Sequence, residues 1–121
     1  MRWAAAAGCL LGAGLSEGAR AESGAFALIE VNARDGGIEI AASALALTAG
    51  EYDAEMVIDR RGAGGTVSTR QGRKLSLGDG ETGDISRVGV SYQVGDSLVV
   101  TVTVKRDGIV IAESTLSAPK N

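Results

Sequence analysis

The sequence predicts an all-β fold: a seven-stranded immunoglobulin-like or fibronectin-like β-sandwich that follows a cleaved signal peptide. Three observations favour this fold class. Short runs of Val, Ile, Leu and Ala alternate with polar residues at the two-residue period of a strand with one buried face. Turn signals built on glycine recur about every 8 to 12 residues, which is typical of β-sandwiches. The single proline, Pro119, interrupts none of these runs.

The first 21 residues have the pattern of a secretory signal peptide. Arg2 supplies a positive start, residues 4–15 are apolar, and the Ala-Arg-Ala sequence at 19–21 matches a cleavage site. We therefore expect the mature chain to begin at Glu22. The apolar run is too short to span a bilayer as a helix, so the sequence predicts export without a membrane span.

The remaining residues, 22–121, are enough for one domain with one core. Loss of Arg2, Arg20 and Glu17 with the signal leaves 10 basic and 14 acidic side chains, a net charge of about −4, which disfavours nucleic-acid binding. The chain has no histidine, and its one cysteine, Cys9, lies in the signal. Lipidation of Cys9 is an alternative, but few apolar residues precede it. We expect no enzyme, no cofactor, no bound metal and a monomer.

The first three strands are expected at 26–34, 38–47 and 52–60. An Asp-Gly pair at 35–36 predicts a hairpin turn between the first two, since these residues tolerate the positive φ of tight turns. The alanine-rich stretch at 43–50 equally suits a helical turn. In the first strand Ala27, Ile29, Val31 and Ala33 share one face. The residues predicted to face inward from the next two strands are Ile38, Ile40, Ala42, Tyr52, Ala54, Met56 and Ile58.

The fourth strand, expected at 66–77, contains a conflict. If Leu75 and the other apolar residues of this run face the core at a period of two, Gln71 and Arg73 must face it as well. A β-bulge would turn these polar side chains away, and glycine suits a bulge. The sequence therefore predicts a bulge or break at Gly72.

The last three strands are expected at 85–92, 97–105 and 109–116. The run SLVVTVTV at 97–104 is uncharged and strongly β-forming, the profile of an aggregation-prone segment, and Asp96 and Lys105 flank it as gatekeepers. A buried central strand is the favoured interpretation. The inward-facing residues predicted for this half of the chain are Val67, Leu75, Leu77, Val88, Val90, Leu98, Val100, Val102 and Val104.

A basic cluster is the first candidate functional site. Five of the ten basic residues of the mature chain fall within 15 positions: Arg60, Arg61, Arg70, Arg73 and Lys74. If the strands at 52–60 and 66–77 are neighbours, these charges form one patch that attracts an acidic or polar partner and speeds encounter. The alternative is a solvated face that keeps an edge strand from pairing with other chains.

Other candidates have weaker support. The loop at 78–84 offers three carboxylates for calcium but lacks the spacing of an EF-hand, so a plain turn is favoured. Asp53 and Glu55 share one strand face, but the scarcity of aromatic residues disfavours a glycosidase. Ser91 and Ser97 have no histidine to activate them.

The order of motifs between residues 64 and 104 resembles a known family. The basic run S-T-R-Q-G-R-K at 68–74 leads into L-S-L-G, an acidic loop, a second strand, a V-G-D turn and V-V-T-V-T-V. The run E-V-N-A-R-D-G-G-I-E-I at 30–40 looks like an opening hairpin of one branch. Together they resemble the small curli-assembly proteins of the CsgC/CsgH type, the hairpin matching the CsgH branch.

The resemblance implies a periplasmic protein that delays polymerisation of an amyloidogenic curli subunit, its client, by transient contact without ATP or cofactor. It places Arg70, Gln71, Arg73 and Lys74 at the client-contacting surface, to which the nearby Arg60 and Arg61 are added as members of the basic cluster. The CsgC branch carries a cysteine pair near the third strand, where this chain has Ala-Gly-Glu-Tyr at 49–52, so the CsgH branch is favoured. The alternative function is a secreted adhesive or carbohydrate- or surface-binding sandwich.

Overall fold

The computed structural model describes residues 24–119. The predicted signal peptide at 1–21, its cleavage before Glu22 and the alternative at Cys9 lie outside the described residues. Between residues 24 and 119 the chain forms seven strands and no helix. This part of the chain accordingly holds no helix that could cross a membrane.

The structure confirms the seven predicted strands, and their ends lie within three residues of the predicted ones. The alanine-rich end of the second strand continues as strand rather than as a helical turn. The strands are β2 (Ala25–Arg34), β3 (Gly37–Ala46), β4 (Gly50–Gly62), β5 (Gly65–Leu77), β6 (Thr82–Ser91), β7 (Ser97–Arg106) and β8 (Ile109–Ala118).

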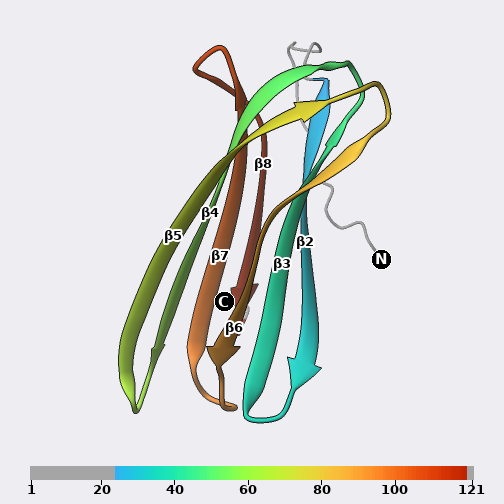
Figure 1. Ribbon diagram of the computed structural model, residues 1–121. Helices are drawn as coiled ribbons and strands as arrows, with labels where there is room; N and C mark the ends of the chain where they lie inside the picture. The colour runs from blue at the N-terminus through green and yellow to red at the C-terminus, as the bar shows by residue number, and fades with distance from the viewer. Residues whose placement is uncertain (1–23, 120–121) are drawn as a thin grey trace.

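The strands form two antiparallel sheets, one with the order β2-β3-β6 and one with the order β5-β4-β7-β8. The sheets lie face to face, with the β2–β3 and β4–β5 hairpins at one end of the sandwich and the β7–β8 hairpin at the other (Figure 1). In constant-type immunoglobulin domains the fourth strand belongs to the sheet of the first two. Here the fourth strand, β5, pairs instead with β4 and becomes an edge strand of the wider sheet.

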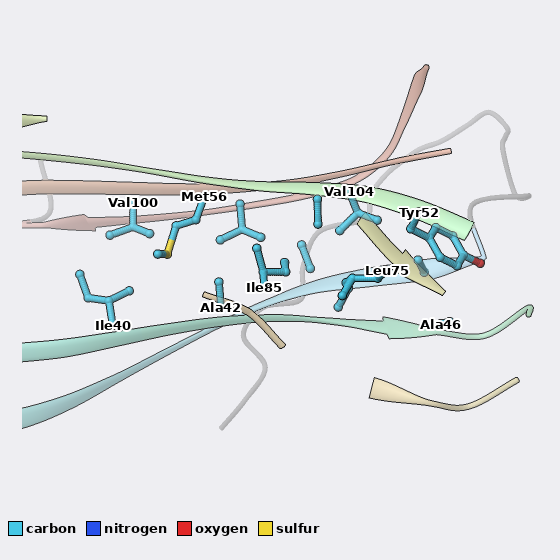
Figure 2. Packing of buried hydrophobic residues seen from close by; sticks show 14 of the residues in the cluster. Ile40, Ala42, Ala46, Tyr52, Met56, Leu75, Ile85, Val100 and Val104 are labelled. Atoms are coloured by element: carbon cyan, nitrogen blue, oxygen red, sulfur yellow. The ribbon is translucent and has the colours of Figure 1, made fainter. Parts of the chain in front are cut away.

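The core lies between the sheets, where β4 and β7 present alternate residues to Ile40 and the alanines of β3 (Figure 2). Met56, Val100 and Val102 are fully buried, as the alternation predicts. Tyr52 closes one end of the core, and its hydroxyl donates a hydrogen bond to the carbonyl of Thr48. The other buried apolar residues are Ala25, Ala27, Ile40, Ala42, Ala44, Ala46, Ala54, Ile58, Leu75, Leu77, Ile85, Leu98 and Val104.

Val67 was expected in the core but is 40% exposed. It lies on β5, for which the three-stranded sheet offers no fourth strand as cover. Only Leu75 and Leu77 of β5 are buried. The burial of a strand face therefore depends on the sheet opposite as well as on the alternation.

The prediction of a bulge at Gly72 is wrong. Pairing of β4 with β5 continues without a shift from Gly50 opposite Leu77 to Gly62 opposite Gly65. Gln71 and Arg73 do lie on the core-facing side of β5, but they remain exposed at its uncovered edge.

The register shifts occur in other strands. Ser86 and Asp84 pair with consecutive residues of β3, which leaves Ile85 as the extra residue of β6. In the same way, Ile111 is the extra residue of β8 opposite β7. The β-bulges are therefore at isoleucines on edge strands, where bulges are common.

The acidic loop uses its carboxylates to hold main-chain groups. Asp79 Oδ1 accepts a hydrogen bond from the N–H of Ala49 at 2.6 Å, and Glu81 Oε1 accepts one from the N–H of Gly78 at 2.7 Å. The N–H of Ala46 also donates to the carbonyl of Glu81 at 2.9 Å. The loop therefore ties the β5–β6 connection to the β3–β4 connection. Within the described range, no group of three or more acidic, His or Cys side chains is arranged to hold a metal.

Truncation on the two faces of β7 should have unequal effects on stability. Val102 is fully buried, whereas Val99 is 40% exposed on the opposite face of the same strand. Val102→Ala should lower the free energy of unfolding by about 2 kcal/mol, because it removes two buried methyl groups and leaves a cavity. Val99→Ala should lower it by less than about 1 kcal/mol. Urea denaturation measures both; equal losses would contradict the assigned faces.

Candidate functional site

The strands β4 and β5 bring most of the candidate basic residues together. The register sets Lys74 opposite Asp53, Gly72 opposite Glu55 and Arg70 opposite Val57. Because side chains alternate along a strand, Arg70, Gly72 and Lys74 share the outer face of the four-stranded sheet. The prediction that these two strands are neighbours is confirmed.

Acidic residues of β4 pair with the basic side chains of this outer face. Arg70 Nη1 lies 3.2 Å from Glu55 Oε2, and Lys74 Nζ lies 3.1 Å from Asp53 Oδ1. The side chains of Arg70 and Lys74 remain 70% and 87% exposed. Exposed pairs of this kind contribute little to stability and exchange readily with water or a partner. The face therefore presents neighbouring charges of both signs and few buried contacts.

Gln71 and Arg73 project from the other face of β5, at the side where β5 and β6 meet. The hydroxyl of Ser86 donates a hydrogen bond to Oε1 of Gln71, and Arg73 Nη1 donates to the carbonyl of Asp84 at 3.0 Å. These contacts connect the edges of the two sheets through side chains. Within residues 24–119 Arg73 forms no ion pair, so its charge is not matched by a carboxylate.

Arg60 and Arg61 have different surroundings although they are adjacent in sequence. Arg61 is exposed on the outer face and forms no ion pair within residues 24–119. Arg60 points inward, and its Nη1 lies 3.4 Å from Oδ2 of Asp96, with each side chain only 11% exposed. The structure therefore separates Arg60 from the outer surface that carries Arg61, Arg70 and Lys74.

Asp96 organises the β6–β7 connection around this ion pair. Its Oδ2 also accepts a hydrogen bond from the N–H of Gln93 at 3.1 Å, and its carbonyl accepts one from the hydroxyl of Tyr92 at 3.0 Å. A Cβ at Gly62 would collide with Oδ1 of Asp96, so this close approach requires glycine at the end of β4. The Nε of Arg60 is buried and has no hydrogen-bond partner in the described part of the chain, which offsets part of the stabilisation.

A shallow hollow of about 380 Å³ lies on the outer face beside Lys74. The sequence reasoning did not include three of the residues that line it, Gly72, Thr103 and Lys105, in a surface site. It considered Asp53 and Glu55 only as a catalytic pair. The available signal was the matching of acidic residues on one strand with basic residues on the next, both at a period of two.

Comparison with known proteins finds similar solved structures but no similar sequence family. No family model and no curated protein sequence matches the chain. Among solved structures, the curli protein CsgC of E. coli matches with a TM-score of 0.67 and 14% identity, over 79% of this chain and 99% of that chain. CsgH of R. palustris matches with a TM-score of 0.60 and 15% identity, over 74% of this chain and 90% of that chain.

The chain has a CsgC/CsgH-like fold. At 14–15% identity the likeness concerns the fold and transfers no residue roles. In this CsgC/CsgH-like sandwich, the six predicted site residues occupy three environments. Arg61, Arg70 and Lys74 lie on the outer face, Gln71 and Arg73 at the β5–β6 side, and Arg60 in the interior ion pair.

Substitution of the two adjacent arginines of β4 should separate the roles of their charges. Arg60→Leu leaves the buried carboxylate of Asp96 without its cation and should lower the free energy of unfolding by about 3 kcal/mol. Arg61→Leu, the matched control on the exposed face, should change it by less than about 0.5 kcal/mol. Urea denaturation of both variants checks the difference. A loss at Arg60 no greater than that at Arg61 would show that the interior pair does not stabilise the sandwich.

Proposed function

We propose that this protein is a periplasmic, chaperone-like inhibitor of curli subunit polymerisation that acts by transient, ATP-independent contact through β5 and its neighbour β4. The observation that carries the proposal is the likeness of fold to the curli protein CsgC over 99% of that chain. The likeness to CsgH adds support. The exportable N-terminal sequence is consistent with a periplasmic location.

The exposed charges of β4 and β5 suit weak and reversible contact. The pairs Arg70–Glu55 and Lys74–Asp53 are held by single contacts of 3.1–3.2 Å between solvent-accessible side chains. Polar groups of a client therefore reach these charged groups at low free-energy cost. Contact of this kind slows the addition of new chains to an early oligomer without sequestering the client in a stable complex.

The position of these charges at a sheet edge also protects the inhibitor itself. The strand β5 is an edge strand, and long charged side chains on an edge oppose strand-to-strand pairing with further chains. An inhibitor of amyloid growth needs this property, because an open edge would otherwise serve as a template. The proposed action uses binding alone and requires no catalytic group.

The test of the proposal is a thioflavin time course of a purified curli subunit with substoichiometric amounts of residues 22–121. The lag before fibre growth should lengthen in proportion to the amount of this protein added. An unchanged lag at every ratio would exclude the proposed function.

Charge reversal on the outer face should weaken inhibition. Arg70→Glu combined with Lys74→Glu places like charges beside Glu55 and Asp53 and should remove most of the added lag. The matched control is Arg34→Glu combined with Arg87→Glu, which makes the same change in net charge on the three-stranded sheet. The control should retain inhibition, and equal loss in both variants would indicate an effect of net charge alone.

Inhibition should also weaken as salt rises. The distance over which exposed charges interact is about 10 Å near 0.1 M salt and about 3 Å near 1 M salt. The added lag should therefore shrink across this range when it is compared with the lag of the subunit alone at each salt concentration. An added lag that does not change with salt would argue for pairing through strand edges instead.

A further inference from the structure

Gly72 has none of the usual reasons for a glycine in the middle of a strand. Its φ lies outside the left-handed region, and the β4–β5 register passes it without a bulge. A Cβ built there would meet only the carbonyl oxygen of Ala54, at an ordinary contact distance of 3.5 Å. Because glycine weakens the interior of a strand, its presence here points to a use for the missing side chain.

Gly72 lines the hollow of about 380 Å³ on the outer face of the four-stranded sheet, where a longer side chain would enter it. Two rows of the sheet surround it. One row runs from Lys74 through Asp53 to Lys105, and the next from Gly72 through Glu55 to Thr103. The main chain at Gly72 therefore lies at the bottom of a site whose walls are polar side chains from three strands.

The outer-face side chains that line the hollow supply two carboxylates, two ammonium groups and one hydroxyl. Ala54 and Arg73 also line it, but their side chains point to the other face of the sheet. A charged guest of either sign would face like charges, and a hydrocarbon guest would desolvate these groups without pairing them. A carboxamide carries two N–H donors and one carbonyl acceptor on a neutral group. It can donate to Glu55 or Asp53 while it accepts from Lys74 or Lys105.

The existing ion pairs leave room for such a guest. An ionised carboxylate has about four acceptor sites and an ammonium group three donors, whereas Glu55 and Asp53 each have one basic partner. Thr103 donates its hydroxyl to Glu113 Oε2 at 3.4 Å, which leaves the lone pairs of that oxygen available. A carboxamide therefore adds hydrogen bonds without breaking either ion pair.

We propose that the hollow over Gly72 binds the carboxamide side chain of an asparagine or glutamine in an extended segment of the client. The identity of the client rests on the proposed function, whereas the chemistry of the site rests on its walls. Amide side chains stack into ladders along amyloid fibrils. Capture of one amide in the hollow competes with the next layer of such a ladder.

The first experiment measures binding directly. A short acetylated peptide of alternating serine and threonine with a central glutamine is titrated into the ¹⁵N-labelled protein and followed by NMR. The amide signals of Gly72, Lys74 and Thr103 should shift, and binding should be severalfold tighter than for peptides with a central glutamate, lysine or leucine. Absence of these shifts, or equal or tighter binding of any other peptide, would overturn the proposal.

The second experiment fills the hollow. Gly72→Thr places a β-branched side chain in it, and Gly89→Thr is the matched control because Gly89 lies in β6 with open space around its Cβ position. Both variants should melt at or above the temperature of the unmodified protein, since threonine favours strands. Gly72→Thr alone should lose the glutamine-peptide shifts and shorten the added lag in fibre growth.

The outcomes separate this proposal from the function on which it rests. If the unmodified protein delays fibre growth and Gly72→Thr delays it equally, the hollow does not hold the client, although the inhibitory function stands. If the glutamine peptide binds at Gly72 but the unmodified protein causes no delay, the amide site stands and the proposed function fails. A Gly72→Thr variant that melts well below the Gly89→Thr control would show that the glycine is needed for folding, which contradicts the premise.

Discussion

The pairing of β4 with β7 is the constraint on which the rest of the structure depends. Met56 lies opposite Val102 and Ile58 opposite Val100, and all four side chains are fully buried. A slip of one residue would exchange the two faces of β4 and turn its carboxylates into the core. The same register that builds the core therefore places Asp53 and Glu55 on the outside. Pairing with β5 then sets them beside the basic side chains, so the core and the candidate surface have one origin.

Two arginines on neighbouring strands have different physical roles in this sandwich. The guanidinium of Arg60 is removed from water and compensated by Asp96, so its main contribution is to hold the β6–β7 connection against β4. The guanidinium of Arg70 keeps its hydration while it contacts Glu55. Desolvation makes the first pair costly to break and the second easy to exchange. Burial, rather than residue type, therefore separates the stabilising charges from those available to a partner.

The success and failure of the sequence predictions follow from how local each signal is. The inner residues of β4 and β7 were predicted because alternation is a property of each strand alone. The burial of Gln71 and Val67 depends on whether a strand of the other sheet covers β5. The sequence around these residues does not indicate whether such a strand is present. The prediction of a bulge at Gly72 failed because it assumed that every core-facing position is covered.

The candidate site shows the same limit. The basic residues of β4 and β5 were grouped once the two strands were assumed to be neighbours, but their acidic partners on β4 were not recognised. The partner of Arg60 lies 36 residues away in a turn, so its burial followed only from the three-dimensional structure. The bulges at Ile85 and Ile111 had no sequence signal, because isoleucine is ordinary in a strand. Hollows such as the one beside Gly72 involve three strands and become visible only when all three are assembled.

The long-range pairing of β7 has a consequence for how the chain reaches this fold. The β4–β5 hairpin closes over two residues, Ala63 and Gly64, whereas Met56 and Val102 are more than forty positions apart. Sandwiches dominated by such distant contacts fold in about milliseconds to seconds, because the chain loses loop-closure entropy before the distant contacts form and stabilise it. During that interval the uncharged run at 97–104 is uncovered, with Asp96 and Lys105 as its nearest charges. A protein that we propose restrains amyloid growth in another chain thus has an aggregation-prone segment of its own, which is exposed while it folds. The rate at which β7 pairs with β4 determines how long that segment can aggregate.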